Sequence, residues 1–202
     1  KLGLEFFLTF GAEGVQQIKE QFDVDIFLDL KLHDIPNTVS AAASAVAHLQ
    51  PRFLTVHASG GAAMIAAAVN AVPAVDITAV TILTSLSEDD LFDIGFSHPA
   101  LESAVSLAEL AVRSGAKAIV SSPLEISAIR SAVGEKATII TPGVRPAGSG
   151  GHDDQVRTMT PEAAISAGAN FVVIGRPITG AWSQGRQAMA EAAATIAAAI
   201  ER

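Results

Sequence analysis

Residues 25–38 read DIFLDLKLHDIPNT, and this stretch passes from a buried strand into a helix. Its first half is apolar and bounded by charge, as expected for the end of a buried strand. Side chains alternate between the two faces of a strand, so we predict that Phe27, Asp29 and Lys31 share one face. Asp34 follows where the strand has ended. Two carboxylates around one lysine are costly to assemble in a partly dry site, which indicates a chemical role.

Each of these charged residues also has a purely structural interpretation. Asp34 could be the N-cap of the helix, with Pro36 tolerated in the first turn. Asp29 and Lys31 could form a structural ion pair at the mouth of a barrel. Their grouping at the carboxyl end of one buried strand favours catalysis over the structural alternative.

The overall composition narrows the class of protein. The chain has 202 residues, 50% of them hydrophobic, with a formal charge of -8 and no cysteine. This length is enough for one domain with a sizeable core. The acidic balance argues against a nucleic-acid or anionic-membrane surface, so a few local cations would have to meet an anionic substrate. The lack of cysteine excludes disulfides and thiol chemistry within this stretch and suits a cytoplasmic enzyme.

Strand and helix patterns alternate along the chain. Lys1 is placed at the end of one strand, and further strands are predicted at residues 26–30, 53–57, 77–83, 118–121, 138–141 and 171–174. Helices are predicted at residues 5–10, 12–21, 38–49, 62–72, 99–114, 124–133, 161–167 and 178–200. Strict alternation with nearly continuous apolar strands is typical of a parallel sheet covered by helices.

A closed barrel is favoured over an open sheet because no dinucleotide-binding glycine pattern follows the first strand. The glycine cluster at residues 148–151 lies late in a loop and does not lead directly from strand to helix. An eight-stranded barrel needs roughly 250 residues. We therefore predict an α/β fold, a TIM (β/α)8 barrel, as a single domain over residues 1–202. Its first βα unit and most of its second strand are expected to lie outside the given sequence.

The last two predicted strands carry candidates for phosphate binding, a common role of this part of a barrel. Gly175 lets backbone N–H groups approach an anion, and Arg176 offers a forked set of donors. A turn glycine followed by a surface arginine is the structural alternative. The long, Gly-rich stretch at residues 141–155 is interpreted as a lid, with Arg145 and Gln155 near its two ends as candidate ligand contacts.

Other polar residues give weaker signals. His57 ends a strand and could face the site, although a buried barrel histidine with satisfied hydrogen bonds is equally plausible. Thr84 and Ser85 could supply hydroxyl groups to a polar ring, while helix capping is equally plausible for Ser85 or Ser87. We expect no metal and no cofactor, because metal-ligand spacing is lacking among His33, His48, His98 and His152.

The decapeptide at residues 29–38, DLKLHDIPNT, closely resembles the signature of the orotidine 5'-monophosphate decarboxylases. KLGLEFF at residues 1–7 resembles the segment that carries this family's first catalytic lysine. Further matches follow in the same order, at AVTILTS (79–85), TPGVR (141–145), DQVR (154–157) and IGR (174–176). The resemblance spans essentially the whole chain. The decapeptide is specific, whereas the Gly-Arg element is shared by many phosphate-binding barrels.

The resemblance implies a carboxy-lyase that converts orotidine 5'-monophosphate to uridine 5'-monophosphate, the last step of de novo pyrimidine nucleotide synthesis, without a metal. It implies a catalytic network of Lys1, Asp29, Lys31 and Asp34, in which Lys31 is the proton donor. It also implies a homodimer in which Asp34 and Thr38 reach into the neighbouring subunit's site.

Substrate contacts are implied as well. Thr84 and Ser85 would lie near the pyrimidine, and Gln155 would bridge base and phosphate. The phosphate would be held or gated by Gly175, Arg176 and Arg145. One departure is that the family's first strand carries an aspartate for the ribose hydroxyls, and no such strand is present in the given sequence.

The chemistry suits these residues. Decarboxylation at a ring carbon without an adjacent electron sink leaves a localised carbanion, which needs a fixed cation nearby and then a proton. Lys31 can supply both, and Asp29 and Asp34 favour its ammonium form. Asp29 would also face the departing carboxylate, so that like charges repel until carbon dioxide leaves.

Two other functions stay open. A magnesium-dependent sugar-phosphate decarboxylase or aldolase on the same kind of barrel can share an Asp-x-Lys-x-x-Asp core, although the continuation at residues 35–38 favours the nucleotide enzyme. A non-catalytic nucleotide-phosphate binder could keep the fold. Mere binding, however, does not need two carboxylates around a lysine.

Overall fold

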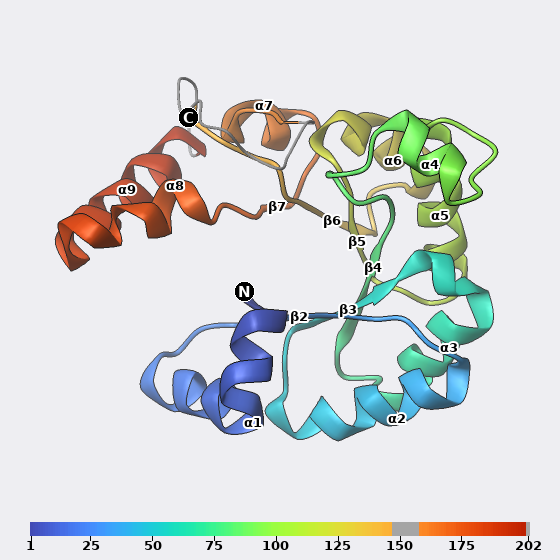
Figure 1. Cartoon of the computed structure of the whole chain (residues 1–202), viewed down its shortest axis with the longest axis horizontal. Helices are drawn as coiled ribbons and strands as arrows, with labels where there is room; N and C mark the ends of the chain where they lie inside the picture. Colours follow the sequence, from blue (N-terminus) through green and yellow to red (C-terminus); the bar gives the residue numbers. More distant parts are fainter. Residues whose placement is uncertain (147–157, 201–202) are drawn as a thin grey trace. The chain divides into compact units, whose positions relative to one another are not determined.

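The computed structural model describes residues 1–146 and 158–200 (Figure 1). Within these ranges, a seven-stranded sheet has its strands in sequence order. They are β1 (Leu2–Gly3), β2 (Phe27–Leu32), β3 (Phe53–His57), β4 (Asp76–Val80), β5 (Ala118–Val120), β6 (Thr138–Thr141) and β7 (Phe171–Val172). Neighbours run parallel in the pairs β1–β2, β2–β3, β3–β4 and β6–β7. A doubly wound sheet would require a reversal of strand order, so this order confirms the predicted barrel class.

Helices connect these strands. They are α1 (Leu4–Gln21), α2 (Pro36–Val46), α3 (Gly61–Ala71), α4 (Glu88–Asp93), α5 (Ala100–Arg113), α6 (Ile126–Val133), α7 (Pro161–Ser166), α8 (Arg176–Thr179) and α9 (Arg186–Ile200). Short 3-10 turns are η1 (Ala47–Leu49), η2 (Ala58–Gly60), η3 (Pro123–Glu125) and η4 (Gly180–Gln184). No described helix is long and apolar enough to cross a bilayer.

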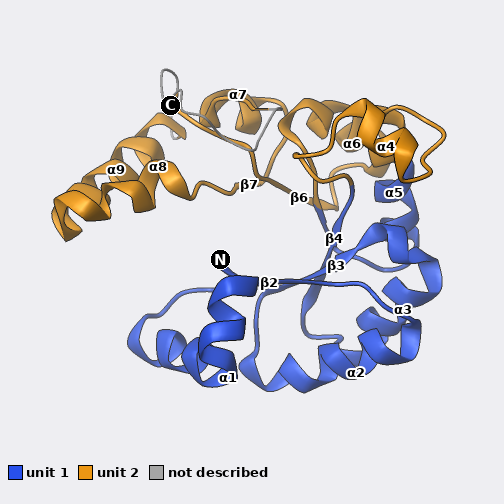
Figure 2. Ribbon diagram, viewed as in Figure 1, with its two compact units in different colours: residues 1–81, 106–119 blue, residues 82–105, 120–202 orange. Residues whose placement is uncertain are grey.

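The backbone groups into two compact units (Figure 2). The first comprises residues 1–81 and 106–119, and the second comprises residues 82–105 and 120–202. The expectation of a single barrel domain over residues 1–202 stays a prediction.

The core of the first unit is built on a buried row across its strands. Leu28 of β2 is in register with Leu54 of β3, which is in register with Ile77 of β4, and each is at most 1% exposed. Buried residues on the helices lie one, three or four positions apart, as one apolar helix face requires. These are Val39, Ala43 and Val46 on α2, and Met64, Ile65 and Ala68 on α3.

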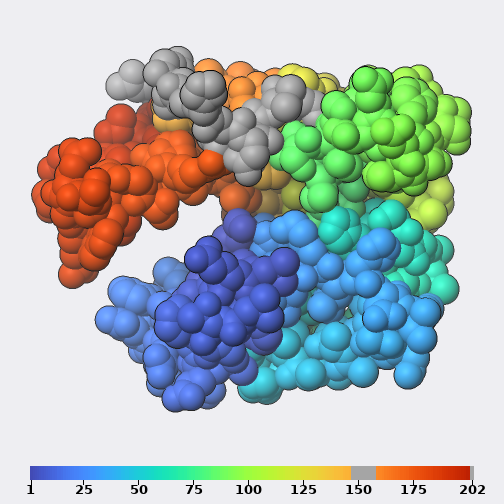
Figure 3. All heavy atoms as spheres, viewed as in Figure 1, coloured from blue at the N-terminus to red at the C-terminus, as the bar shows by residue number. Residues whose placement is uncertain are grey.

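Helix α1 lies at the surface of the molecule, in dark blue in Figure 3. It was predicted as two helices interrupted at Gly11, and Gly11 indeed has non-helical angles (φ 62°, ψ −160°) between two helical stretches. Its exposed apolar side chains include Leu8 and Phe10.

In the second unit, Arg130 of α6 links elements that are distant in sequence. Its guanidinium donates hydrogen bonds to the backbone oxygens of Gly134, Ala137 and Gly168, at 2.7 to 2.9 Å. It also donates to Asn170 Oδ1 at 2.7 Å, and this oxygen accepts the N–H of Ile139 in β6. One planar cation therefore fixes where β6 begins and where the chain enters β7.

Some predicted boundaries are wrong. The strand predicted at residues 77–83 ends at Val80, and the one predicted at residues 171–174 ends at Val172. Helix α4 was not predicted. It begins at a capping box, in which Ser87 Oγ accepts the N–H of Asp90 and Asp90 Oδ2 accepts the N–H of Ser87. The capping role considered for Ser85 or Ser87 thus belongs to Ser87.

Candidate active site

Asp29 of β2 is the centre of a charged cluster in the first unit. It is 6% exposed, yet its carboxylate is ionically paired at both oxygens. Oδ2 accepts a hydrogen bond from Lys1 Nζ at 2.8 Å, and Oδ1 accepts one from Lys31 Nζ at 2.7 Å. Lys1 is brought there by β1, because Gly3 is in register with Asp29. The structure therefore brings together three of the four residues predicted as the catalytic network.

The backbone around Lys31 is irregular. Lys31 has a φ of 50°, a left-handed conformation that residues other than glycine seldom adopt. The register with β3 shifts between Leu28 and Leu32. Asp29 and Lys31 thus meet as predicted, but regular alternation along the strand is not the whole reason.

Thr55 of β3 completes the cluster and was missed by sequence reasoning. Its side chain is fully buried, and its Oγ1 accepts a hydrogen bond from Lys31 N at 2.7 Å. The same hydroxyl donates to Asp29 Oδ1 at 3.1 Å. The sequence signal that could have identified Thr55 as a site residue was its place on the same strand face as His57, two residues earlier.

The cluster keeps the carboxylate ionised. Burial alone would raise the pKa of Asp29, but hydrogen bonds from Lys1 and Lys31, together with their charges, lower it more, so the pKa lies below its ordinary 3.8. Asp29 therefore carries a full negative charge at neutral pH between two ammonium groups.

His57 lies beside this cluster at the end of β3 and is half-buried. Its ring centroid is 5.3 Å from that of His33. Burial lowers the pKa of His57 below its ordinary 6.5, and the neighbouring His33 and Lys31 lower it further. Asp29 acts in the opposite direction, and the net shift favours the neutral form of His57 next to Lys31.

Asp34 and Thr38 lie outside the cluster, and both are exposed. Asp34 Oδ1 accepts the N–H of Ile35 at 2.6 Å. In the part of the chain that the structure describes, Asp34 forms no ion pair with Lys1 or Lys31. The N-cap of α2 is Ile35, without a side-chain cap hydrogen bond, so the alternative of Asp34 as N-cap is wrong.

The remaining predicted residues belong to the second unit. Thr84 is half-buried and Ser85 is exposed, both in a turn after β4. Gly175 is the N-cap of α8, Arg176 is its first residue, and both are exposed. Arg145 follows an isolated bridge between Val144 and Met159, and its N–H donates to Met159 O at 2.9 Å. Gln155, with most of the predicted lid, lies outside the described residues.

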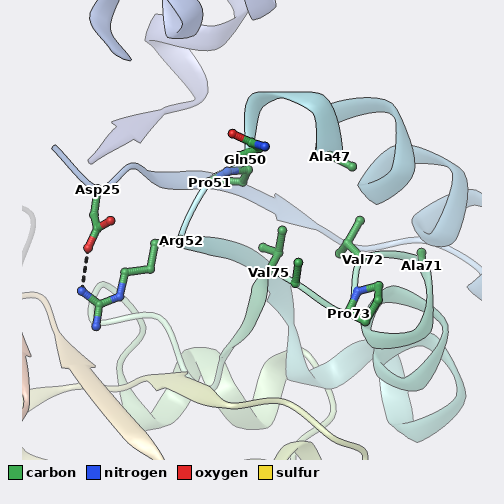
Figure 4. Close-up of a pocket in the computed structure, with 10 residues that line it drawn as sticks. Asp25, Ala47, Gln50, Pro51, Arg52, Ala71, Val72, Pro73 and Val75 are labelled. Carbon is green, nitrogen blue, oxygen red and sulfur yellow. Dashed lines mark hydrogen bonds and ion pairs between the residues drawn. The ribbon is translucent and has the colours of Figure 1, made fainter. Parts of the chain in front are cut away.

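A pocket of about 450 Å³ lies elsewhere in the first unit (Figure 4). It is lined by residues that precede the strands, among them Asp25 before β2, Arg52 before β3 and Val75 before β4. Asp25 and Arg52 form an exposed ion pair at 2.7 Å on its wall. Active sites of parallel barrels lie at the carboxyl ends of the strands, which favours the Asp29 cluster over this pocket. Across the described residues, no group of three or more His, Cys, Asp or Glu side chains is arranged to hold a metal ion.

Comparison with known proteins gives consistent matches over most of the chain. The family model described as Orotidine 5'-phosphate decarboxylase / HUMPS family matches residues 1–192. The orotidine 5'-phosphate decarboxylase of Thermobifida fusca is 53% identical over 193 residues, which cover 96% of this chain and 82% of that protein. The enzyme of the same name from Wolbachia pipientis is 45% identical over 181 residues, covering 89% of this chain and 79% of that protein.

A solved structure gives the same match. The crystal structure of orotidine 5'-phosphate decarboxylase from Lactobacillus acidophilus superposes with a TM-score of 0.83 and 36% identity. The match covers 99% of this chain and 85% of that chain.

Proposed function

The chain belongs to the Orotidine 5'-phosphate decarboxylase / HUMPS family, and we propose that it decarboxylates orotidine 5'-monophosphate to uridine 5'-monophosphate. The observation that carries this proposal is the buried Asp29 carboxylate held between the ammonium groups of Lys1 and Lys31. Release of carbon dioxide from a ring carbon needs a fixed cation beside the carbanion, and the Asp29 carboxylate holds the Lys31 ammonium in place.

Lys31 is the residue that acts on the reacting carbon. When the bond to the carboxylate breaks, carbon dioxide leaves and the electron pair stays on the ring carbon. The Lys31 ammonium stabilises this negative charge and then gives its proton to the same carbon, after which water reprotonates the amine. The electron pair and the proton are thus accounted for without an electron sink, an oxidant or a metal.

Asp29 and Lys1 prepare Lys31 for that role. The Asp29 carboxylate holds the Lys31 ammonium at 2.7 Å, and its own negative charge is maintained because its pKa is lowered. In the substrate complex, this charge faces the carboxylate that departs. Lys1 binds the other oxygen of Asp29 and so fixes the plane of the carboxylate. Preorganised charges of this kind need no rearrangement during the reaction.

We assign the substrate's phosphate to Gly175, Arg176 and Arg145, and its pyrimidine to Thr84, Ser85 and Gln155. Support for the phosphate assignment comes from the exposed Gly175-Arg176 pair, which follows β7 after two intervening residues. The family model also matches across this pair and Arg145. Phosphate binding far from the reacting carbon supplies binding energy that holds the pyrimidine in place.

We also propose that the protein is a cytoplasmic homodimer in which Asp34 and Thr38 enter the neighbouring site. The exposure of both side chains, within nine residues of Asp29 in the sequence, supports this arrangement. Cell fractionation tests the location, and a membrane-bound or exported protein would contradict it.

The test of function is the change in ultraviolet absorbance of orotidine 5'-monophosphate in excess EDTA, with the product identified by chromatography. We expect prompt formation of uridine 5'-monophosphate. Lys31→Ala is expected to lower kcat more than about a thousandfold while still binding the product. Lys117→Ala is the matched control, because Lys117 also pairs with an aspartate, Asp76 at 3.0 Å, but outside the cluster. Arg176→Ala should mainly raise KM.

Each contrary result has a definite meaning. Retained turnover in Lys31→Ala would remove Lys31 from the mechanism, and an unchanged KM in Arg176→Ala would refute the phosphate assignment. Activity on sugar phosphates that needs magnesium would favour the sugar-phosphate enzyme. Bound orotidine 5'-monophosphate recovered unchanged would indicate a nucleotide binder.

A further inference from the structure

Thr55 is the one residue of the cluster that contacts both Asp29 and the backbone of Lys31. A hydroxyl has a single proton to donate and lone pairs to accept with. The N–H of Lys31 can only donate, and the ionised carboxylate of Asp29 can only accept. The hydroxyl proton of Thr55 is therefore committed to Asp29 Oδ1, while its lone pair receives Lys31 N–H. Among the natural side chains of similar size, only serine can replace threonine both as donor to Asp29 and as acceptor from Lys31.

The hydrogen bond to Lys31 compensates for an interrupted strand ladder. In a regular parallel pair, this N–H would bond to a carbonyl of the neighbouring strand. Here the register between β2 and β3 shifts, Lys31 adopts a φ of 50°, and the Thr55 side chain takes the N–H instead. The Lys31 backbone is held in an unfavourable conformation. The Thr55 hydroxyl that binds its N–H therefore sets the position from which the Lys31 side chain extends.

Thr55 is also the stiffest member of the cluster. Lys1 and Lys31 are long side chains that are about a third exposed, at 36% and 31%. Thr55 is fully buried in the middle of β3, and β-branching restricts its side chain to few rotamers. Of the three donors to Asp29, it is therefore the one whose position is set by the sheet.

We propose that Thr55 is a positioning residue of the reaction: its hydroxyl sets the orientation of the Asp29 carboxylate and the backbone of Lys31, and through them the position of the Lys31 ammonium. This inference rests on the proposed decarboxylase function. It assigns Thr55 no contact with the substrate, so its effect belongs to kcat and not to substrate affinity.

The test compares Thr55→Val, which keeps the shape but removes the hydroxyl, with Thr55→Ser, which keeps the hydroxyl. Thr78→Val is the matched control, because Thr78 is the register partner of Thr55 on β4 and is equally buried. The Thr78 hydroxyl donates to the Asp76 backbone oxygen instead. Thr55→Val should lower kcat roughly 10- to 100-fold, the loss of one hydrogen bond to a charged group, with product affinity within about twofold. Thr55→Ser and Thr78→Val should stay within about threefold of the wild type.

A second measurement separates this inference from the proposed function. Amide hydrogen exchange at Lys31, followed by NMR, should accelerate in Thr55→Val and stay slow in Thr55→Ser and Thr78→Val. If the wild type does not act on orotidine 5'-monophosphate, the proposed function is wrong. If the Lys31 amide exchanges at the wild-type rate in Thr55→Val, the proposed positioning by Thr55 is wrong as well.

With an active wild type, full activity in Thr55→Val would overturn the inference. An equal loss in Thr78→Val would do the same, because it would show a general packing effect. If Thr55→Val does not fold, Thr55→Cys replaces it, since a thiol is a poor donor and acceptor in both directions.

Discussion

At the scale of single residues, the buried charge of Asp29 links stability to chemistry. The ionised form is favoured in the folded protein because Lys1 and Lys31 donate to it. A pKa lowered by folding means that Asp29 contributes stability above its unfolded value of 3.8 and that this contribution is lost as the pH falls through the folded pKa. The same charge that faces the substrate therefore stabilises the fold in the neutral range.

This linkage predicts the behaviour of Asp29→Asn. At pH 7 the variant should have a free energy of unfolding lower by about 1–3 kcal/mol, because two lysines lose their charged partner. The difference should begin to shrink as the pH falls below 3.8, where Asp29 of the unfolded chain becomes protonated, and should be lost as the pH falls through the lower pKa of folded Asp29. Urea unfolding of both proteins between pH 2.5 and pH 7 measures it. Asp25→Asn is the control, since the exposed Asp25–Arg52 pair should contribute little.

His57 adds a second pH-dependent contribution, in a higher pH range than that of Asp29. Because folding lowers the pKa of His57 below 6.5, its contribution to stability is complete above pH 6.5 and declines as the pH falls. The Asp29 charge raises the pKa of His57, so Asp29→Asn lowers that pKa further, and the difference between the two proteins below pH 6.5 includes this change as well as the direct contribution of Asp29. Parallel stability curves for the two proteins over the whole range would contradict the assignment.

The sequence predicted the site unevenly, for physical reasons. Asp29 and Lys31 are two positions apart in one strand, so regular alternation was enough to predict that they lie close together, although the irregular backbone at Lys31 also contributes to their contact. Thr55 could not be paired with them, because its role depends on a register shift and on the left-handed backbone of Lys31. Asp34 was a candidate helix cap because aspartate is a favoured N-cap residue, but the helix begins at Pro36 and its N-cap is Ile35.

At the scale of elements, the break in α1 is encoded by one glycine. Gly11 has a φ of 62° with a ψ of −160°, a combination that side chains with a Cβ strongly disfavour. A Cβ at this position would meet no atom within 4 Å, so the penalty of a substitution is one of backbone conformation and not of collision.

Gly11→Ala should therefore lower the free energy of unfolding by about 1–3 kcal/mol. Gly180→Ala is the control, because Gly180 has an ordinary φ of −61° and equally open space around its added Cβ. It should be neutral or slightly stabilising, since alanine reduces the freedom of the unfolded chain. Thermal and urea unfolding measure both. Equal losses in the two variants would show that α1 does not depend on the conformation of Gly11.

Errors in the predicted elements have an identifiable cause. The apolar run that predicted a strand through residue 83 reflects burial, and Thr81 and Ile82 are indeed buried, but β4 ends at Val80. Hydrophobicity reports burial, while a strand ends where pairing ends. Helix α4 escaped notice because six residues are too few to show a helical period, although its capping box at Ser87 was present in the sequence.

At the scale of the whole molecule, alternating patterns were enough to predict the sequential strand order, because a short connection through a helix places the next parallel strand alongside. Alternation carries no information about contacts with a second chain. Asp34 lies just before α2 and Thr38 lies in its first turn, and both are exposed. Contacts with a second chain would be made at this place.

Sharing of sites between subunits predicts complementation between two inactive variants. Lys31→Ala and Asp34→Ala should each be nearly inactive alone. If Asp34 serves the neighbouring site, a mixed dimer contains one site with both defects and one intact site. Random mixing makes half of the dimers mixed, and half of the sites in these are intact, so about a quarter of wild-type activity should return.

The matched control for this experiment mixes Lys31→Ala with Asp29→Ala. Asp29 and Lys31 of one chain contact each other at 2.7 Å, so both residues serve the same site. Every site in the mixed dimer then lacks one of them, and activity should stay at the level of the separate variants. Recovery in this control would mean that the chains had exchanged more than whole subunits. No recovery in the Lys31→Ala and Asp34→Ala mixture, with subunit exchange verified by mass spectrometry, would place Asp34 in its own subunit's site or outside catalysis altogether.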